Sequence, residues 1–257
     1  MNMALLHVNF FSNVLGLASS MDVILPQSAG RQIGMQSVNT SKYPTLYLLH
    51  GLSDDQTAWQ RYTSIERYAM EFGYAVVMPT TFRFAYTDSP AGKYYTYLAE
   101  ELPTICHDFF PRMSSDPKEN FVAGLSMGGY GAFKLALRCP QTFGAAASLS
   151  GALTWGSQAH TDPELRFIFG DDPRGSENDV LELMRRRAIQ NEQIPLYQWC
   201  GTEDYLLQEN EKVHALANAL HWNDYTYKTS SGDHDWRAWD AQIRSVLEWM
   251  HAHLQAE

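Results

Sequence analysis

The sequence predicts an α/β fold with a mostly parallel central sheet of about eight strands and helices on both faces. Short, continuous apolar runs, typical of strands buried on both sides, alternate with segments of helical periodicity. Strands that alternate with helices in this way form a parallel sheet covered by helices. We find no internal repeat, low-complexity tract or linker, so we expect residues 1–257 to form a single domain.

The N-terminal segment differs from the rest because its residues alternate in polarity. Apolar side chains at Leu6, Val8 and Phe10 alternate with other residues, which is typical of a half-buried strand. Residues 21–25 are expected to pair with this strand as an N-terminal antiparallel hairpin. The segment 27–42 is rich in Ser, Gly, Gln and Asn and predicts a loop.

The remaining elements follow in order along the chain. Buried strands are expected at residues 45–49, 74–78, 121–125, 145–149 and 196–199, with a shorter candidate at 225–227. Helices are expected at residues 57–72, 95–110, 130–137, 180–189, 210–220 and 236–254, because apolar residues recur there at helical spacing. Two long connections remain, at 80–97 and 152–178, and long connections often carry function. A parallel sheet binds ligands at the carboxyl ends of its strands.

Composition and charge exclude several classes of protein. The chain is 45% hydrophobic and 19% charged, which excludes a disordered chain. Its 19 basic and 29 acidic residues give a net charge of −10, and an acidic surface repels phosphate backbones and anionic membranes. We therefore expect neither nucleic acid nor a membrane as partner, and we expect no spanning helix or secretory signal. Three cysteines without C-x-x-C spacing indicate reduced thiols and a cytoplasmic protein.

The strongest motif is Gly124-Leu125-Ser126-Met127-Gly128, a G-x-S-x-G sequence between an expected strand and an expected helix. A tight strand-to-helix turn would push the Ser126 hydroxyl out of the sheet, and the glycines remove side chains that would collide across it. The helix that follows offers unpaired amides and a partial positive charge. We therefore expect Ser126 to be a nucleophile and the Met127 N–H to bind an oxyanion.

A serine nucleophile needs a base, and in this motif's order an acid and then a histidine follow. The downstream candidates are His160, His214, His221, His234, His251 and His253. His234 is favoured because it lies in a loop between the last expected strand and the last expected helix. Asp204 and Glu203 compete as the acid directly after the strand at 196–199, and a short carboxylate fixed by a turn favours Asp204.

A second oxyanion donor is expected in the loop that follows the strand at 45–49. We assign it to the N–H of Leu52. Ser53 and Gln56 have the spacing of a capping box, which would set where the next helix begins. His50 ends the strand, and we expect its role to be structural.

Four motifs resemble the esterase D-like group of α/β-hydrolases, which includes bacterial tributyrin or acetyl esterases and S-formylglutathione hydrolases. The motifs are Leu48-Leu49-His50-Gly51, Gly124-Leu125-Ser126-Met127-Gly128-Gly129-Tyr130-Gly131-Ala132, Gly201-Thr202-Glu203-Asp204 and Gly232-Asp233-His234-Asp235-Trp236. The resemblance spans residues 5–254 and implies an α/β-hydrolase fold with no large lid domain. It implies a carboxylesterase that prefers short acyl chains and needs no cofactor. It supports Ser126, Asp204 and His234 as the triad and Leu52 and Met127 as oxyanion donors.

The serine motif departs from that of S-formylglutathione hydrolases, which usually read G-H-S-M-G-G-H. This chain has Leu125 and Tyr130 in place of the two histidines, and it lacks a G-A-G-F-Y-like segment near residues 91–95. These departures favour a general esterase. An S-formylglutathione hydrolase-type thioesterase or an acyltransferase with the same triad is the alternative. A non-catalytic binding protein on this fold is disfavoured because no triad residue is missing.

The substrate pocket is less clearly marked in the sequence. Aromatic density in the two long connections suits an apolar acyl or aryl group, with Trp155, Tyr94 and Tyr95 as candidate wall residues. We expect a small-molecule ester as the substrate and leave a homo-oligomer open. The histidines form no H-E-x-x-H motif, so no metal site is predicted.

Overall fold

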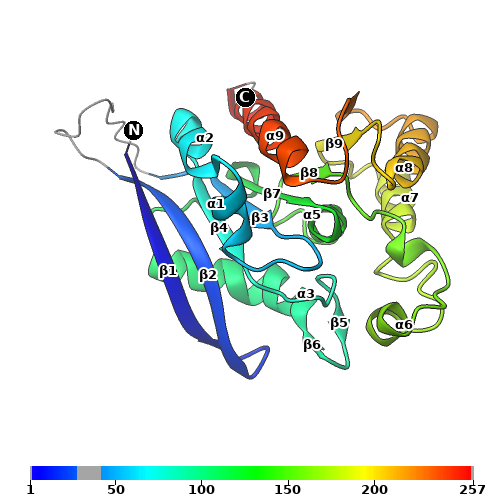
Figure 1. Ribbon diagram of the computed structural model, residues 1–257, viewed down its shortest axis with the longest axis horizontal. Coiled ribbons are helices and arrows are strands. Elements are labelled where there is room, and N and C mark those ends of the chain that lie inside the picture. Colours follow the sequence, from blue (N-terminus) through cyan, green and yellow to red (C-terminus); the bar gives the residue numbers. More distant parts are fainter. Residues whose placement is uncertain (1, 28–41, 256–257) are drawn as a thin grey trace.

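The computed structural model describes residues 2–27 and 42–255 (Figure 1). Eight strands in these two ranges form one sheet, in the order β1-β2-β4-β3-β7-β8-β9-β10. They are β1 (Asn2–Ser12), β2 (Leu17–Gln27), β3 (Thr45–Leu49), β4 (Ala75–Pro79), β7 (Asn120–Leu125), β8 (Ala145–Leu149), β9 (Leu196–Gly201) and β10 (Tyr225–Ser230). From β4 to β10 all neighbouring strands are parallel, whereas β2 pairs antiparallel with both β1 and β4. The predicted mostly parallel sheet with antiparallel N-terminal strands is confirmed.

Helices cover both faces of this sheet (Figure 1). They are α1 (Ala58–Tyr62), α2 (Ile65–Phe72), α3 (Tyr94–Thr96), α4 (Leu102–Phe109), α5 (Met127–Arg138), α6 (Pro163–Phe169), α7 (Val180–Gln190), α8 (Leu207–Ala219) and α9 (Trp236–Gln255). Alternate residues of the central strand β3 point to opposite faces. Leu46 and Leu48 join a buried cluster with α1, α2 and α9, while Tyr47 and Leu49 join another with α4, α5, α7 and α8.

The single helix expected at residues 57–72 is wrong, because the structure has two helices there. Thr63 is extended, with φ −136° and ψ 172°, and separates α1 from α2. The backbone N–H of Ser64 donates to Asp240 Oδ1 of α9 at 2.8 Å. A contact from the far end of the chain therefore satisfies the amide of the residue that caps α2, and local periodicity carries no sign of that contact.

The capping box expected from Ser53 and Gln56 is also wrong. Helix α1 begins at Ala58. The carboxylate of Asp55 accepts from the N–H of Thr57 at 2.8 Å, so an aspartate turn forms just before the helix instead.

The two long connections contain elements that the sequence pattern did not predict. Residues 88–93 form a small hairpin of β5 (Asp88–Ser89) and β6 (Gly92–Lys93). Helix α6 begins at Pro163, with Asp162 accepting from two backbone amides of its first turn. This Asp-Pro start was a readable capping signal.

The helix expected at 95–110 is interrupted by a π-helical turn, η1 (Tyr97–Glu101), between α3 and α4. The carboxylate of Glu101 in that turn accepts from the Ser12 hydroxyl and from the Asn13 N–H, at the end of β1. The loop expected at 27–42 lies, for residues 28–41, outside the described residues. Within the described ranges, no helix is long and apolar enough to cross a membrane.

Candidate active site

The turn between β7 and α5 is strained at Ser126, whose φ of 52° and ψ of −117° are rare for a residue with a side chain. A Cβ atom on Gly124 would lie 2.4 Å from the carbonyl carbon of Gly128. A Cβ on Gly128 would lie 2.5 Å from the carbonyl oxygen of Leu49. The two glycines therefore let β7, α5 and β3 approach each other closely, which forces the sharp turn at Ser126.

The Ser126 hydroxyl faces an imidazole from the far end of the chain. Its Oγ lies 3.0 Å from Nε2 of His234, and Nδ1 of that ring lies 2.9 Å from Oδ2 of Asp204. Ser126 follows β7, Asp204 follows β9 and His234 follows β10. The structure thus brings together, in one hydrogen-bonded row, the three side chains that the sequence singled out. Their catalytic roles stay predictions.

The acid in this row is fully buried and held from two sides. The backbone N–H of Leu206 donates to Asp204 Oδ1 at 2.8 Å, while His234 occupies Oδ2. Burial by itself raises the pKa of Asp204, but hydrogen bonds to its carboxylate, led by the one from His234, outweigh burial and hold the pKa below its ordinary value. An ionised Asp204 accepts a hydrogen bond from the Nδ1–H of His234, which leaves the Nε2 lone pair of the ring directed at Ser126.

The competing carboxylate, Glu203, has a different partner. Its Oε2 accepts from the backbone N–H of Gly232 at 2.5 Å, and its own N–H donates to the Gly232 carbonyl at 3.1 Å. A Cβ on Gly201 would lie 2.1 Å from that same carbonyl oxygen. The loop that carries His234 is therefore joined, backbone to backbone, to the loop that carries Asp204.

Two aromatic rings enclose the imidazole, and sequence reasoning missed both. Trp239 meets the His234 ring edge to face, with centroids 4.9 Å apart, and Tyr205 tilts over it at 4.6 Å. Trp239 is buried, whereas Tyr205 is 72% exposed. Trp239 lies inside the helix expected at 236–254 with no feature that sets it apart, and the one signal for Tyr205 was its place next to the candidate acid.

The two amides expected to bind an oxyanion belong to segments that meet at the serine turn. Met127 is the first residue of α5, so its N–H has no acceptor within the helix. Leu52 follows Gly51, and a Cβ on Gly51 would lie 2.8 Å from the Leu125 side chain, so this loop passes against the serine turn. Among the described residues, neither N–H donates a hydrogen bond. Their roles stay predictions.

His50 holds the loop that contains Leu52, in agreement with a structural role. Its Nδ1 lies 2.7 Å from the Gly51 carbonyl oxygen, and the Thr81 N–H donates to its Nε2 at 3.1 Å. The ring is 1% exposed, and burial lowers its pKa to about 4. His50 is therefore neutral near pH 7, with the proton on Nδ1 and an acceptor at Nε2.

Of the expected wall residues, Trp155 lies in the short turn η3 (Trp155–Ser157), in the connection that follows β8. The N–H of Ala152 donates to the Ser126 carbonyl at 3.1 Å, and the Trp155 ring lies 6.3 Å from that of Tyr130 in α5. Trp155 therefore stays a candidate for the pocket wall.

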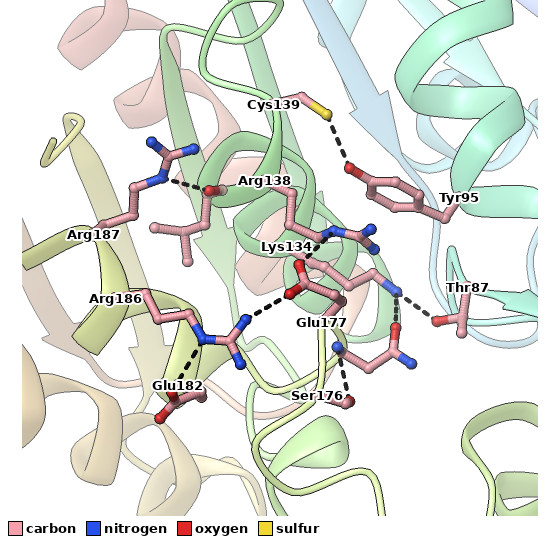
Figure 2. Close-up of polar contacts among 12 residues, drawn as sticks. Thr87, Tyr95, Lys134, Arg138, Cys139, Ser176, Glu177, Glu182, Arg186 and Arg187 are labelled. Atoms are coloured by element: carbon pink, nitrogen blue, oxygen red, sulfur yellow. Dashed lines mark hydrogen bonds and ion pairs between the residues drawn. The ribbon is translucent and has the colours of Figure 1, made fainter. Parts of the chain in front are cut away.

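Tyr94 and Tyr95 are placed differently. Tyr94 stacks on Phe84 with ring centroids 4.8 Å apart, within the 80–97 connection. The Tyr95 hydroxyl lies 2.9 Å from Sγ of Cys139, past the C-terminal end of α5 (Figure 2). That end is about 20 Å along the helix from Ser126. The structure does not bring Tyr95 to the serine site.

The side chains of three of the other downstream histidines have partners other than Ser126. His160 contacts the Trp155 carbonyl, His214 stacks on Tyr227, and His253 pairs with Asp224. Within the described ranges, no group of three His, Cys, Asp or Glu side chains could hold a metal ion.

Comparisons with known proteins show which family the chain resembles. Residues 12–250 match the family model Esterase, described as "Putative esterase". An acetyl esterase from Caldicellulosiruptor saccharolyticus is 29% identical, over 96% of this chain and 98% of its own. A fluorophosphonate-binding serine hydrolase of Staphylococcus aureus has 34% identity and a TM-score of 0.85, covering 97% of this chain and 98% of its own. An S-formylglutathione hydrolase of the same organism has 32% identity and a TM-score of 0.84, covering 98% and 100%.

Proposed function

We propose that this chain, which belongs to the esterase family, is a serine esterase acting on short-chain acyl esters. The premise is that it is a carboxylic ester hydrolase of the esterase D-like group with an α/β-hydrolase fold. Ser126, His234 and Asp204 form its catalytic triad. The observation that carries the proposal is the row of hydrogen bonds from the Ser126 hydroxyl through His234 to the buried Asp204 carboxylate.

In this mechanism, Ser126 Oγ attacks the ester carbonyl carbon while Nε2 of His234 takes the hydroxyl proton. The N–H groups of Leu52 and Met127 bind the oxyanion of the tetrahedral intermediate. The intermediate collapses, the bond to the alcohol oxygen breaks, and the imidazolium donates its proton to the departing alcohol. A water molecule, deprotonated by His234, then attacks the acyl-enzyme and releases the acid and free Ser126.

Ser126→Ala tests the nucleophile. Loss of the attacking oxygen should lower kcat for p-nitrophenyl acetate by about a millionfold. The matched control is Ser245→Ala, which removes a hydroxyl from α9 outside the loops of Ser126, Asp204 and His234. Near-parental turnover by Ser126→Ala would refute the assignment.

The preference for short acyl chains is supported by the acetyl esterase relative. We expect kcat/KM for p-nitrophenyl acetate and butyrate to exceed that for the decanoate by at least about tenfold, because a pocket shaped for a short acyl chain has no room for the further methylenes, and the longer chain displaces the ester carbonyl from Ser126. A decanoate turned over as fast as the butyrate would remove the short-chain proposal while leaving the triad intact.

A thioesterase of the S-formylglutathione hydrolase type is the second candidate, because a structure of that activity is 32% identical. Against it, Leu125 is buried beside Gly51 and Tyr130 donates to the Asn178 carbonyl at 2.8 Å, so both positions are filled by structural side chains. The ratio of kcat/KM for S-formylglutathione and for p-nitrophenyl acetate distinguishes the two. A ratio well above one would favour the thioesterase.

A further inference from the structure

A fully buried lysine lies in the helix that begins after Ser126, and the proposed mechanism does not use it. Lys134 in α5 has no exposed surface, and within the described residues no carboxylate forms an ion pair with it. Its Nζ donates to Thr87 Oγ1 at 2.5 Å (Figure 2). It also lies 3.3 Å from Asn178 Oδ1 and 3.4 Å from the Ala85 carbonyl oxygen. A buried amine is costly unless acceptors surround it. All three acceptors belong to segments outside the helix.

Aromatic rings complete the surroundings of this amine. The Nζ of Lys134 lies 4.8 Å from the ring centre of Tyr130 and 5.8 Å from that of Tyr95. Burial, with a smaller contribution from Arg138, lowers the pKa of Lys134 well below its ordinary value. Without a carboxylate partner, Lys134 acts as a hydrogen-bonding centre that ties α5 to its neighbours.

The segment that Lys134 holds is strained. Phe82, Ala85 and Tyr86 have φ values of 51°, 46° and 53°, in the left-handed region that residues with side chains seldom adopt. Such conformations persist only where surrounding contacts impose them. Lys134 contacts the residue before Tyr86 and the residue after it, so it fixes the turn that presents Tyr86.

Tyr86 connects this turn to the loop of Leu52. Its ring lies directly on α5, since a Cβ on Gly131 would come 2.3 Å from Tyr86 Cδ2. The ring is fully buried, and its hydroxyl donates to the carbonyl oxygen of His50 at 2.7 Å. Only Gly51 separates His50 from Leu52. A continuous set of contacts therefore runs from Lys134 through Tyr86 to the loop with the proposed oxyanion donor.

We propose that Lys134 and Tyr86 are positioning residues for ester hydrolysis. Lys134 holds the strained turn, and Tyr86 fixes the His50 carbonyl, so that the N–H of Leu52 points at the oxyanion. This inference rests on the proposed function, in which Leu52 is one of two oxyanion donors. A donor that is misdirected by a fraction of an ångström stabilises the transition state less, while the bound ester is little affected.

Tyr86→Phe tests the contact between Tyr86 and the His50 carbonyl, because it removes the hydroxyl and leaves the ring. We expect kcat for p-nitrophenyl acetate to fall about tenfold, with KM within about twofold of the parent. The affinity for a trifluoromethyl ketone, which forms an oxyanion on Ser126, should fall by the same factor as kcat/KM. A merely structural role of Tyr86 would not make the ketone affinity and kcat/KM fall by the same factor.

Tyr47→Phe is the matched control. Tyr47 is also a buried tyrosine, on β3, and its hydroxyl has no hydrogen-bond partner within the described ranges. We expect parental kcat and ketone affinity for this variant. If Tyr86→Phe also kept parental values, or raised only KM, the positioning role of Tyr86 would be refuted.

A double-mutant cycle tests whether Lys134 acts through Tyr86. Lys134→Met should lower kcat at least as much as Tyr86→Phe does, and the double variant should be no slower than Lys134→Met alone. Additive losses would refute the coupling. If Lys134→Met fails to fold, Thr87→Val, which removes the amine's 2.5 Å contact, takes its place in the cycle.

Ser126→Ala separates the two proposals: an active Ser126→Ala enzyme would refute the proposed function, whereas parental Tyr86→Phe kinetics would refute only this inference.

Discussion

Two adjacent carboxylates hold His234 in different ways. Asp204 binds the imidazole ring, and Glu203 binds the Gly232 amide two residues before it. Glu203 is exposed, and hydrogen bonds, above all from the Gly232 amide, hold its pKa below the ordinary value. It is therefore ionised at neutral pH and ready to keep the loop in place. In our account, Asp204 sets the tautomer of the base and Glu203 sets its position.

Replacing Glu203 by alanine should slow turnover without unfolding the protein. We expect kcat to fall about tenfold, because the His234 loop loses its anchor and the base moves relative to Ser126. Glu203→Gln keeps an acceptor for the Gly232 amide and should retain most of the activity. Steady-state kinetics of both, beside Glu211→Ala on exposed α8 as control, check this. An alanine variant as fast as the parent would show that the loop needs no anchor.

The neutral state of His50 links stability to pH. Its folded pKa of about 4 lies below the ordinary 6.5, so the unfolded chain takes up this proton first. The contribution of neutral His50 to the free energy of unfolding is full above pH 6.5. It is lost as the pH falls toward 4, by about 3 kcal/mol in all. Asp204, with a pKa below its ordinary value, loses its contribution only at lower pH.

Urea unfolding between pH 7 and pH 4 measures this effect. The parent should lose unfolding free energy across this window, with about one extra proton bound on unfolding. His50→Gln, which cannot titrate, should be less stable at pH 7 and show a flatter dependence. Identical slopes for the two proteins would contradict the assignment of this titration to His50.

The sequence predicted the three side chains that the structure brings together, but not the residues that support them. Ser126, Asp204 and His234 were identified because each lies in a local pattern, a glycine-flanked turn or a loop directly after a strand. Glu203 was weighed only as a rival acid, and nothing in the sequence set Tyr86 apart from the other aromatic residues of the 80–97 connection. Their partners, Gly232 and His50, lie far away in sequence, so no local pattern reports these contacts.

At the scale of elements, the glycines of α5 determine how closely the helix approaches the sheet. A Cβ on Gly128 would meet the carbonyl oxygens of Leu49 and His50 at 2.5 and 2.7 Å. One on Gly129 would meet the Ser148 hydroxyl at 2.5 Å. All these neighbours belong to β3, β8 or the loop of the proposed oxyanion donor. The motif thus sets the packing of α5 as well as the turn at Ser126.

Gly128→Ala should therefore destabilise the protein, although alanine favours a helix over glycine by about 1 kcal/mol. The added methyl group meets backbone atoms that cannot move aside singly, so we expect a net loss of about 1–3 kcal/mol of unfolding free energy. Chemical denaturation measures it. A variant as stable as the parent, or more stable, would mean that the helix can shift without cost.

Periodicity predicted the central elements best and the connections least. All the predicted buried strands are found, because continuous apolar runs directly report burial on both faces. The break at Thr63 and the π-helical turn at 97–101 were missed. Each depends on a partner distant in sequence, Asp240 for Ser64 and Ser12 for Glu101. A tertiary contact overrode local pattern in both places.

At the scale of the whole molecule, the parallel sheet gathers the site from distant segments (Figure 1). The loop of Leu52 follows β3, Ser126 follows β7, Asp204 follows β9 and His234 follows β10. The carboxyl ends of parallel strands meet at one edge of the sheet. Topology alone therefore explains why residues up to 182 positions apart, from Leu52 to His234, can act on one ester.

The net charge of −10 should act on substrates before they bind. Among aryl acetates of similar size, we expect kcat/KM to be lowest for one that carries a carboxylate and higher for neutral or cationic ones. The difference should shrink as ionic strength rises from about 0.01 M to about 0.5 M, since the Debye length falls. A ranking unaffected by salt would place the discrimination in the pocket instead of in the protein's field.

The central claim is that the strained turn delivers Ser126 to His234 as the nucleophile. The most direct test labels the intact protein with a fluorophosphonate and maps the adduct by peptide mass spectrometry. We expect one adduct per chain, on the peptide that contains Ser126, with loss of esterase activity in proportion to labelling. An adduct on another residue, or complete inactivation with Ser126 unmodified, would contradict it.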